Sequence, residues 1–153
     1  MTPEDEAFLR RAIELAADAR AGGEEPYGSL LVGPDGTVLA EDHNTVLSDG
    51  DISAHPEQKL ARWAARELDA ATAAATTMYT SCQPCPMCAS VIARSGLGRV
   101  VFALSAEQFD AIKPPDAGAP DAAQAVYDGP ALHAEARVPV AGYYDQVDEP
   151  GTS

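Results

Sequence analysis

The chain has 153 residues, a length that suits one domain of ordinary size. Its 24 acidic and 10 basic residues give a net charge of −14, which disfavours nucleic-acid substrates because the chain repels phosphate backbones on average. Alanine supplies 30 of the hydrophobic residues, and Leu, Ile, Val and Phe together supply only 28. Composition alone is therefore close to that of disordered chains, and the case for a folded domain rests on the pattern of helices and strands.

The N-terminal sequence, the apolar runs and the cysteines bear on where the protein is located. No apolar run approaches the roughly 20 residues that a membrane-spanning helix needs, and the N-terminal stretch is acidic where a signal peptide would be basic. We therefore expect a soluble, cytoplasmic protein without a membrane partner. The three cysteines all lie between positions 82 and 88, too close together for a disulfide framework, and indicate metal or redox chemistry.

The first half of the chain alternates helix and strand signals. Thr2, Pro3 and Asp5 supply an N-cap, a proline at the first helical position and an acid in the first turn. The elements predicted in this half are, in chain order, a helix from Pro3 to the Gly22-Gly23 pair, a strand over 27–32, a turn over 33–36, a strand over 37–40, a loop over 44–53 and a helix over 56–68.

The second half continues this alternation and then becomes less regular. The predicted elements are a strand over 77–80, a buried helix over 87–94 that ends at Gly96, a strand over 99–104, a proline-rich connection over 113–120, a short helix over 122–127, a strand over 136–141 and a polar tail over 143–153. This order predicts the α/β class, as a three-layer α/β/α domain with a mixed five-stranded sheet. We expect this single domain to span residues 1–153.

Two of the predicted helices begin with residues that bind metals. His55 and Glu57 start one helix, and thirty residues after the histidine Cys85 and Cys88 start the next. A Cys-x-x-Cys turn can place both sulfurs about 2.3 Å from one tetrahedral ion, so that with one imidazole it forms a Zn²⁺ ligand set with a fourth position open. The N–H groups at the helix start are expected to lower the pKa of both thiols and thereby favour metal binding.

Glu57 is the expected proton carrier of this site. An ion with an open position lowers the pKa of a bound water from about 15.7 toward 7. Glu57 lies on the same helical turn as His55 and can accept a proton from that water without binding the metal. The arrangement predicts hydroxide attack on an amidine-type carbon, a C–NH₂ beside a ring nitrogen, after which Glu57 protonates the ring nitrogen and the departing amine to release ammonia.

Other interpretations of the same residues are open. Cys85 and Cys88 could form a redox dithiol, although that leaves His55 and Glu57 without a role. A non-catalytic zinc module would have no need of Glu57. A closed structural zinc needs a fourth ligand, for which the candidates are Cys82, His43 and His133.

The pattern His-x-Glu followed by Pro-Cys-x-x-Cys, here residues 55–57 and 84–88, resembles the signature of the zinc-dependent cytidine deaminase superfamily. The resemblance covers most of residues 5–105. Within the superfamily, residues 79–88 and the tail segment 143–147 are most similar to guanine deaminases. The resemblance implies a cytidine deaminase-like fold, one Zn²⁺ per chain and hydrolysis of an exocyclic amino group.

The same resemblance implies roles for five further residues. Asn44 resembles the asparagine that hydrogen-bonds the base, and Tyr27 either stacks on its ring or belongs to the core of the strand. Ser81 is expected to offer a backbone carbonyl to the leaving amino group. Asp110 either offers a carboxylate to an N–H edge of the base or belongs to a solvated helix start. In guanine deaminases the C-terminal segment closes over the active site, so the tail over 143–153, with Tyr143, is expected to cap the site of its own or of a partner subunit.

The chain departs from the family pattern at Pro56, where the family usually has alanine or glycine. Proline is sterically suited to the first helical turn, but it lacks the N–H that in relatives donates to a ring substituent of the substrate. We therefore expect Pro56 to influence which base is accepted.

The predicted function is zinc-dependent hydrolytic deamination of a small free amino-heterocycle, with a guanine-like purine favoured over a cytosine- or s-triazine-type base. Its expected partners are this small molecule and water, with no nucleic acid. A tRNA adenosine deaminase is less favoured, because a chain at −14 lacks a basic face for RNA. The resemblance to the family, together with the small alanine-rich core, favours a homodimer.

Overall fold

The computed structural model describes residues 1–115 and 125–147 of the chain, which divides into two compact units, residues 1–115 and 116–153. The elements of the first unit are α1 (Pro3–Ala21), β1 (Gly28–Val32), β2 (Val38–His43), α2 (Val46–Asp49), α3 (Pro56–Glu67), α4 (Ala70–Ala74), β3 (Thr77–Cys82), α5 (Pro86–Ser95), β4 (Arg99–Leu104) and α6 (Ala106–Ile112). In the second unit the described residues form α7 (His133–Val147).

Helix α1 begins where the sequence predicts. The Asp5 N–H donates to Thr2 Oγ1 at 3.0 Å, and the Asp5 carboxylate accepts from the Thr2 N–H at 2.9 Å. This reciprocal capping box satisfies two N–H groups that the first helical turn leaves without partners, and Pro3 occupies the first helical position. The helix ends before Gly22, as expected.

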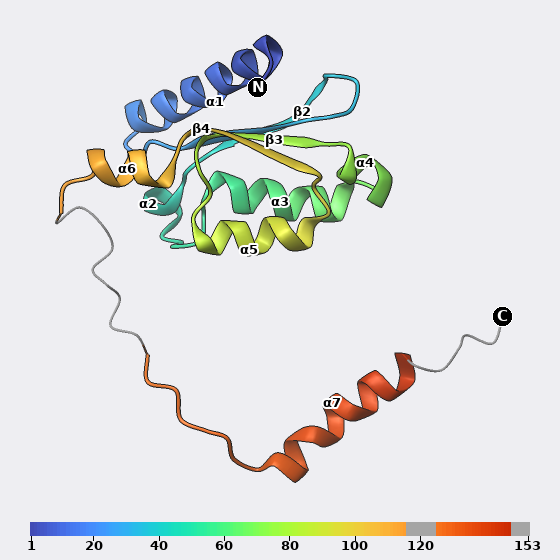
Figure 1. Cartoon of the computed structure of the whole chain (residues 1–153). Coiled ribbons are helices and arrows are strands. Elements are labelled where there is room, and N and C mark those ends of the chain that lie inside the picture. Colours follow the sequence, from blue (N-terminus) through green and yellow to red (C-terminus); the bar gives the residue numbers. More distant parts are fainter. Residues whose placement is uncertain (116–124, 148–153) are drawn as a thin grey trace. The chain divides into compact units, whose positions relative to one another are not determined.

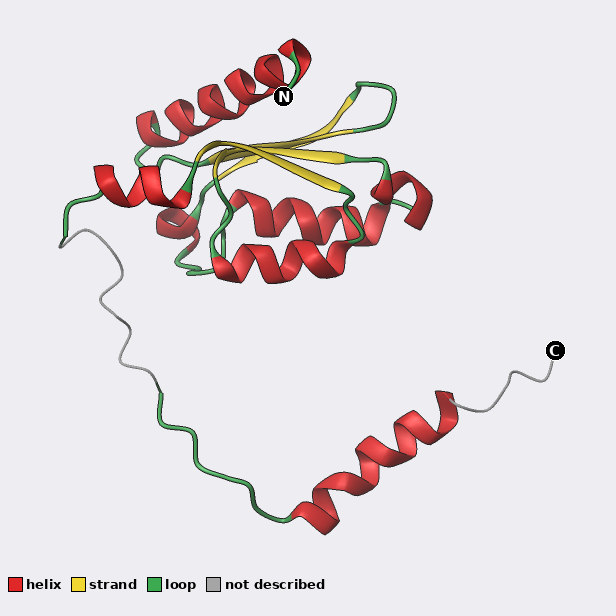
Figure 2. Cartoon of the chain, in the orientation of Figure 1, coloured by secondary structure: helices red, strands yellow, loops and turns green. Residues whose placement is uncertain are grey.

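The sheet of the first unit is mixed. Its strand order is β2-β1-β3-β4, with β1 antiparallel to both neighbours and β3 parallel to β4. Helix α1 covers one face of the sheet, and α3 and α5 lie side by side on the other (Figure 1; the same layers are coloured by secondary structure in Figure 2). This is the expected three-layer α/β/α arrangement.

The core lies on both faces of the two central strands. Every residue of β1 is buried. The cluster between α1 and the sheet contains Leu9, Ala12, Leu15, Leu30, Val32, Tyr79 and Val101. The cluster between α3 and the sheet contains Leu31, Leu60, Ala61, Ala64 and Met78. Alternate residues of one buried strand therefore serve the two cores, as the period of a strand requires.

Asp5 also fastens α1 to the sheet. Its carboxylate accepts two hydrogen bonds from the Arg99 guanidinium, at 2.8 and 2.9 Å, and a third from the Tyr79 hydroxyl at 2.7 Å. The Arg99 hydrogen bonds contribute most to holding the pKa of Asp5 well below its usual range, and burial raises the pKa of Tyr79 to about 12. One carboxylate thus connects the start of α1 to β3 and β4.

Among the described residues the sheet has four strands, so the prediction of five is wrong. The segment predicted as the fifth strand, residues 136–141, lies inside helix α7. Its Val138 and Val140 favour a strand, but a strand needs a neighbour for its backbone hydrogen bonds, whereas a helix satisfies them within the segment. The short helix predicted over 122–127 lies partly outside the described residues, and its described part, 125–127, is not helical.

Other boundaries differ from the predictions in smaller ways. The second strand extends to His43, because β2 is an edge strand and its polar residues Glu41 and Asp42 need no burial. Helix α2 occupies part of the loop predicted over 44–53 and ends at Gly50, whose φ of 60° is left-handed. The sequence did not predict α4 or α6. None of the described helices is both long enough and apolar enough to cross a membrane.

Candidate active site

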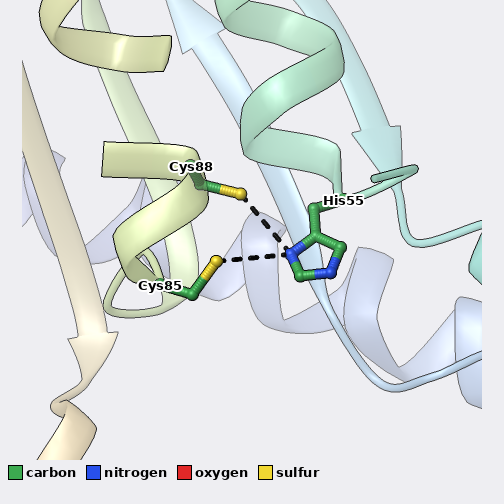
Figure 3. Close-up of side chains that lie close together, drawn as sticks. All are labelled: His55, Cys85 and Cys88. Atoms are coloured by element: carbon green, nitrogen blue, oxygen red, sulfur yellow. Dashed lines mark hydrogen bonds between the residues drawn. The ribbon is translucent and has the colours of Figure 1, made fainter. Parts of the chain in front are cut away.

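The N-termini of α3 and α5 meet, and each begins with a metal-binding side chain. His55 is the N-cap of α3 and Cys85 is the N-cap of α5, and in both helices proline occupies the first helical position. His55 Nδ1 lies 3.6 Å from Cys85 Sγ and 3.4 Å from Cys88 Sγ (Figure 3). The structure therefore brings together the three side chains expected to hold a metal ion.

The geometry of this group fits one zinc ion. The three ligand atoms lie within 4.8 Å of one another. Zinc–sulfur bonds of about 2.3 Å and zinc–nitrogen bonds of about 2.0 Å, set at tetrahedral angles, place nitrogen and sulfur about 3.5 Å apart, close to both observed distances. Within the described part of the chain neither Cys82 nor His43 joins the group, so the proposed closed structural site finds no fourth protein ligand in these two residues.

Cys88 is the buried member of the group. Burial raises the pKa of its thiol well above the usual range, and the nearby charge of Glu57 acts in the same direction. The expectation of a lowered pKa is therefore wrong for Cys88, because it considered the helix N-terminus and not the burial. A cation bound beside the sulfur favours the thiolate, so metal binding at this site is coupled to release of a proton.

Glu57 is buried, and two hydroxyl groups hold one of its carboxylate oxygens. Ser29 Oγ lies 3.1 Å and Thr80 Oγ1 3.2 Å from Glu57 Oε1, and the two hydroxyl oxygens are 2.8 Å apart. Ser29 and Thr80 face each other in the antiparallel ladder of β1 and β3. Each hydroxyl carries a single proton, so when Ser29 donates to Thr80 it is the Thr80 proton that holds Glu57.

Asn44 is fully buried, and four hydrogen bonds fix it. Its backbone N–H donates to the Tyr27 carbonyl at 3.0 Å, and its backbone carbonyl lies 2.9 Å from His43 Nδ1, which donates to it. The side-chain Oδ1 accepts from the Val46 N–H at 2.9 Å, and Nδ2 donates to Glu25 Oε2 at 3.2 Å. These bonds leave one lone pair on Oδ1 and one N–H on Nδ2 for another partner.

Tyr27 is half-buried at the start of β1. Its ring makes an edge contact with Phe109 of α6, with the ring centroids 6.0 Å apart. Burial raises the pKa of Tyr27 to about 12, with smaller contributions from the charges of Cys82, Glu25 and Glu57. The phenol is thus neutral near pH 7, and the groups that influence it include Glu57 of the predicted site.

The remaining predicted residues occupy different surroundings. Ser81 is buried, and its Oγ accepts from the Gly28 N–H at 3.2 Å. Pro56 is fully buried at the first position of α3. Asp110 lies exposed on α6. Tyr143 belongs to α7 of the second unit, where its ring is exposed and packs edge-on against Tyr144. The structure thus brings Glu57 to the metal-binding group and leaves the roles of the others as predictions.

Sequence reasoning missed the residues that support this site. Ser29 and Thr80 hold Glu57, and the signal at Ser29 was a hydroxyl residue beside the apolar run Leu30–Val32. Glu25 and Lys59 carry weaker signals, because a charged residue in a loop or on a helix usually faces solvent. Their partners lie 14 to 19 residues away in the chain, and only the fold shows these contacts.

Several proteins of known sequence resemble the chain. It is 41% identical over 88 residues to the guanine deaminase of Bacillus subtilis, covering 57% of this chain and 56% of that protein. It is 36% identical over 110 residues to a probable cytosine deaminase of Schizosaccharomyces pombe, covering 70% and 64%. It is also 36% identical over 101 residues to the tRNA-specific adenosine deaminase of Haemophilus influenzae, covering 66% and 58%. The chain thus matches 56 to 64% of the length of these relatives.

The fold is similar to that of a solved guanine deaminase from Bacillus subtilis, with a TM-score of 0.70 and 26% identity, covering 99% of each chain. The model of the cytidine and deoxycytidylate deaminase zinc-binding region matches residues 2–104. This match contains both ligand-bearing helix starts and Glu57, and it agrees with a donor set that fits zinc rather than a redox dithiol. The chain therefore belongs to the family of the cytidine and deoxycytidylate deaminase zinc-binding region.

Proposed function

We propose that the protein is a zinc-dependent hydrolytic deaminase of a small free amino-heterocycle, with a guanine-like purine as the favoured substrate. The observation that carries the proposal is the meeting of His55, Cys85 and Cys88 beside a buried Glu57. Bound by these three ligands, Zn²⁺ would supply a Lewis acid that makes water a nucleophile at neutral pH. In the net reaction the ring carbon gains a bond to the water oxygen and loses its bond to nitrogen, which leaves as ammonia.

Glu57 is assigned the proton transfers of this reaction. Its carboxylate would accept one proton from the attacking water and pass it to the ring nitrogen, and would then take the second proton of the same oxygen and pass it to the departing amino group. Because Ser29 and Thr80 hold Oε1, we assign the transfers to Oε2.

The base would be held by residues before β1, after β2, near the end of β3 and on α6. We assign Asn44 to hydrogen-bonding the ring edge through its free lone pair and N–H, and Tyr27 to contact with the ring face. The backbone carbonyl of Ser81 would accept from the amino group, and Asp110 would accept from an N–H of the ring. Tyr143 and the tail segment 143–153, of which 148–153 lie outside the described residues, are proposed to cap the site, in a homodimer or within one chain.

The names of the similar proteins support a free base as the substrate. They include a guanine deaminase and a probable cytosine deaminase, and the guanine deaminase structure is similar along the whole chain. The similarity to a tRNA-specific adenosine deaminase makes tRNA the second candidate. The net charge of −14 favours the free base, because binding to tRNA depends on neutralising phosphates with lysine and arginine.

The proposal is tested by measuring ammonia release from guanine, cytosine, an amino-s-triazine and an adenosine-containing tRNA anticodon stem. We expect turnover of a free base, with guanine preferred, and no turnover of the RNA. Deamination of the RNA alone, or of none of the four, would contradict the proposal.

Pro56 provides a test of specificity in the same assay. Replacing it by alanine restores an N–H at the first position of α3, which can pair with a carbonyl of the base. An unpaired buried acceptor costs about 1–3 kcal/mol, so Pro56→Ala should improve kcat/KM for cytosine by roughly 5- to 150-fold relative to guanine. An unchanged ranking of the substrates would show that this amide does not set specificity.

A further inference from the structure

The residues on both sides of Asn44 in the chain contact Lys59, which lies on the helix that carries His55 and Glu57. Lys59 Nζ donates to Asp42 Oδ1, to the backbone carbonyl of His43 and to Thr45 Oγ1, each at 2.9 Å. An ammonium has three protons, and all three are used. The acceptors lie on both sides of Asn44 in the chain, so a single side chain of α3 fixes the backbone on either side of the asparagine.

The Lys59 contacts are partly protected from solvent. The side chains of Lys59 and Asp42 are 26% and 32% exposed, which makes their ion pair stronger than a pair on the open surface. Lys59 lies four residues after His55 and two after Glu57 on a continuous helix. The three bonds therefore hold the Asn44 backbone to the same rigid element that carries the imidazole and the carboxylate.

Glu25 acts on the other end of the asparagine. Its carboxylate accepts from Asn44 Nδ2, while the Val46 N–H occupies one lone pair of Oδ1. Rotating the amide by half a turn would place an N–H against the Val46 N–H and a carbonyl against the carboxylate, and both contacts are repulsive. Glu25 and Val46 therefore decide which edge of the amide is the donor and which the acceptor.

We infer that Lys59 and Glu25 are positioning residues, of which Lys59 fixes the place of Asn44 relative to His55 and Glu57 and Glu25 fixes the direction of its amide. The inference rests on the proposed function, in which Asn44 contacts the ring of the base. A binding group already in its final orientation loses little freedom when the substrate arrives, and displacing it by about 1 Å can cost on the order of 100-fold in rate.

The first experiment replaces Lys59 by methionine, which has similar length and no donors. Hydrogen exchange of the backbone amides in 42–49 and the kinetics on the best free base are both measured on zinc-loaded protein. Lys59→Met should speed exchange in this segment by at least about 10-fold and lower kcat/KM about 10- to 100-fold, while zinc content stays the same. Arg62→Met, a change at an exposed basic residue of the same helix, is the control and should alter neither.

A milder pair covers the case in which Lys59→Met does not fold. Thr45→Val removes one acceptor of Lys59, whereas Thr45→Ser keeps it. Exchange in 42–49 should be faster in the valine variant and unchanged in the serine variant. Equal exchange in the two Thr45 variants, or normal exchange in a folded Lys59→Met protein, would overturn the role of Lys59.

The second experiment compares Glu25→Gln with Glu25→Ala. Glutamine keeps an acceptor oxygen for Asn44 Nδ2, and alanine removes it, so alanine should lower kcat/KM about 10-fold or more and glutamine should restore it to within about threefold. Equal and normal kinetics in both variants would overturn the role of Glu25. If wild-type protein deaminates none of the free bases, the proposed function fails, while the exchange measurements still decide whether Lys59 fixes the segment.

Discussion

Glu57 is held by side chains from two strands while it is carried by a helix. Ser29 and Thr80 reach the same carboxylate oxygen because they are opposite residues of β1 and β3. A carboxylate with one oxygen fixed in this way has little rotational freedom, so its other oxygen points in a defined direction. A proton carrier needs this, because transfer requires alignment with both the donor and the acceptor.

Replacing Glu57 by glutamine should remove activity without removing the site. The amide has the same shape and can still accept from Ser29 and Thr80, but it does not carry the proton, so turnover should fall at least about 10² to 10⁴-fold while zinc content and fold are retained. Activity is measured as ammonia release, with zinc determined on the same sample.

Glu41→Gln is the matched control for this change. Glu41 pairs at 2.6 Å with Arg11 of α1, the helix on the face of the sheet opposite α3 (Figure 1). This variant should keep full turnover. Near-normal turnover in a zinc-replete Glu57→Gln protein would show that another group carries the proton.

Single residues of the site could be predicted where residue type and motif already indicate the chemistry. His55, Cys85 and Cys88 were identified because a Cys-x-x-Cys turn and an imidazole suit zinc, and the structure brings them together. The hydroxyls of Ser29 and Thr80 were missed, since strand register decides which side chains face Glu57. The pKa of Cys88 was predicted in the wrong direction for a similar reason, because burial is set by the whole fold.

At the scale of elements, α1 packs tightly against the sheet at Gly28. A Cβ placed there would lie 2.5 Å from Leu15 Cβ and 2.6 Å from both the Ala12 carbonyl oxygen and the Ala16 nitrogen. Two of these neighbours are helix backbone, which does not move independently. The small residues Gly28, Ala12 and Ala16 therefore allow α1 to rest directly on β1, the strand that carries Ser29.

Gly28→Ala should destabilise the protein by about 1–3 kcal/mol, because α1 must move away from the sheet. Gly22→Ala is the control: Gly22 has an ordinary φ of −83°, and a Cβ there would meet nothing closer than 3.5 Å. The control should be neutral or stabilising by up to about 1 kcal/mol. Chemical denaturation measures both, and equal stability of the two variants would contradict the close packing described for Gly28.

Elements with local signals were predicted well, and those that depend on distant partners were not. Helix α1 has its capping box, its proline and its apolar spacing within the segment itself, and it begins and ends where expected. The segment 136–141 has valines typical of a strand, yet strand formation requires a partner, and the segment is helical in α7. A strand prediction is therefore conditional on a neighbour that the segment does not specify.

At the scale of the whole first unit, strand order assembles the site. In the order β2-β1-β3, strand β1 lies between the strand that precedes His55 and the strand that precedes Cys85. The two ligand-bearing helices therefore lie side by side on one face of the sheet (Figure 1), and the hydroxyl of Ser29 on β1 contacts the Glu57 carboxylate. Residues separated by thirty positions become ligands of one site as a consequence of topology.

The most direct test of this account is a zinc titration of metal-free protein with ammonia release from guanine as the readout. We predict that activity rises in proportion to added zinc and saturates at one ion per chain. Cys82→Ser should behave in the same way, because Cys82 lies outside the ligand group, whereas Cys85→Ser should neither retain zinc nor recover activity. Full activity without zinc, or an equal response of Cys85→Ser and Cys82→Ser, would contradict the account.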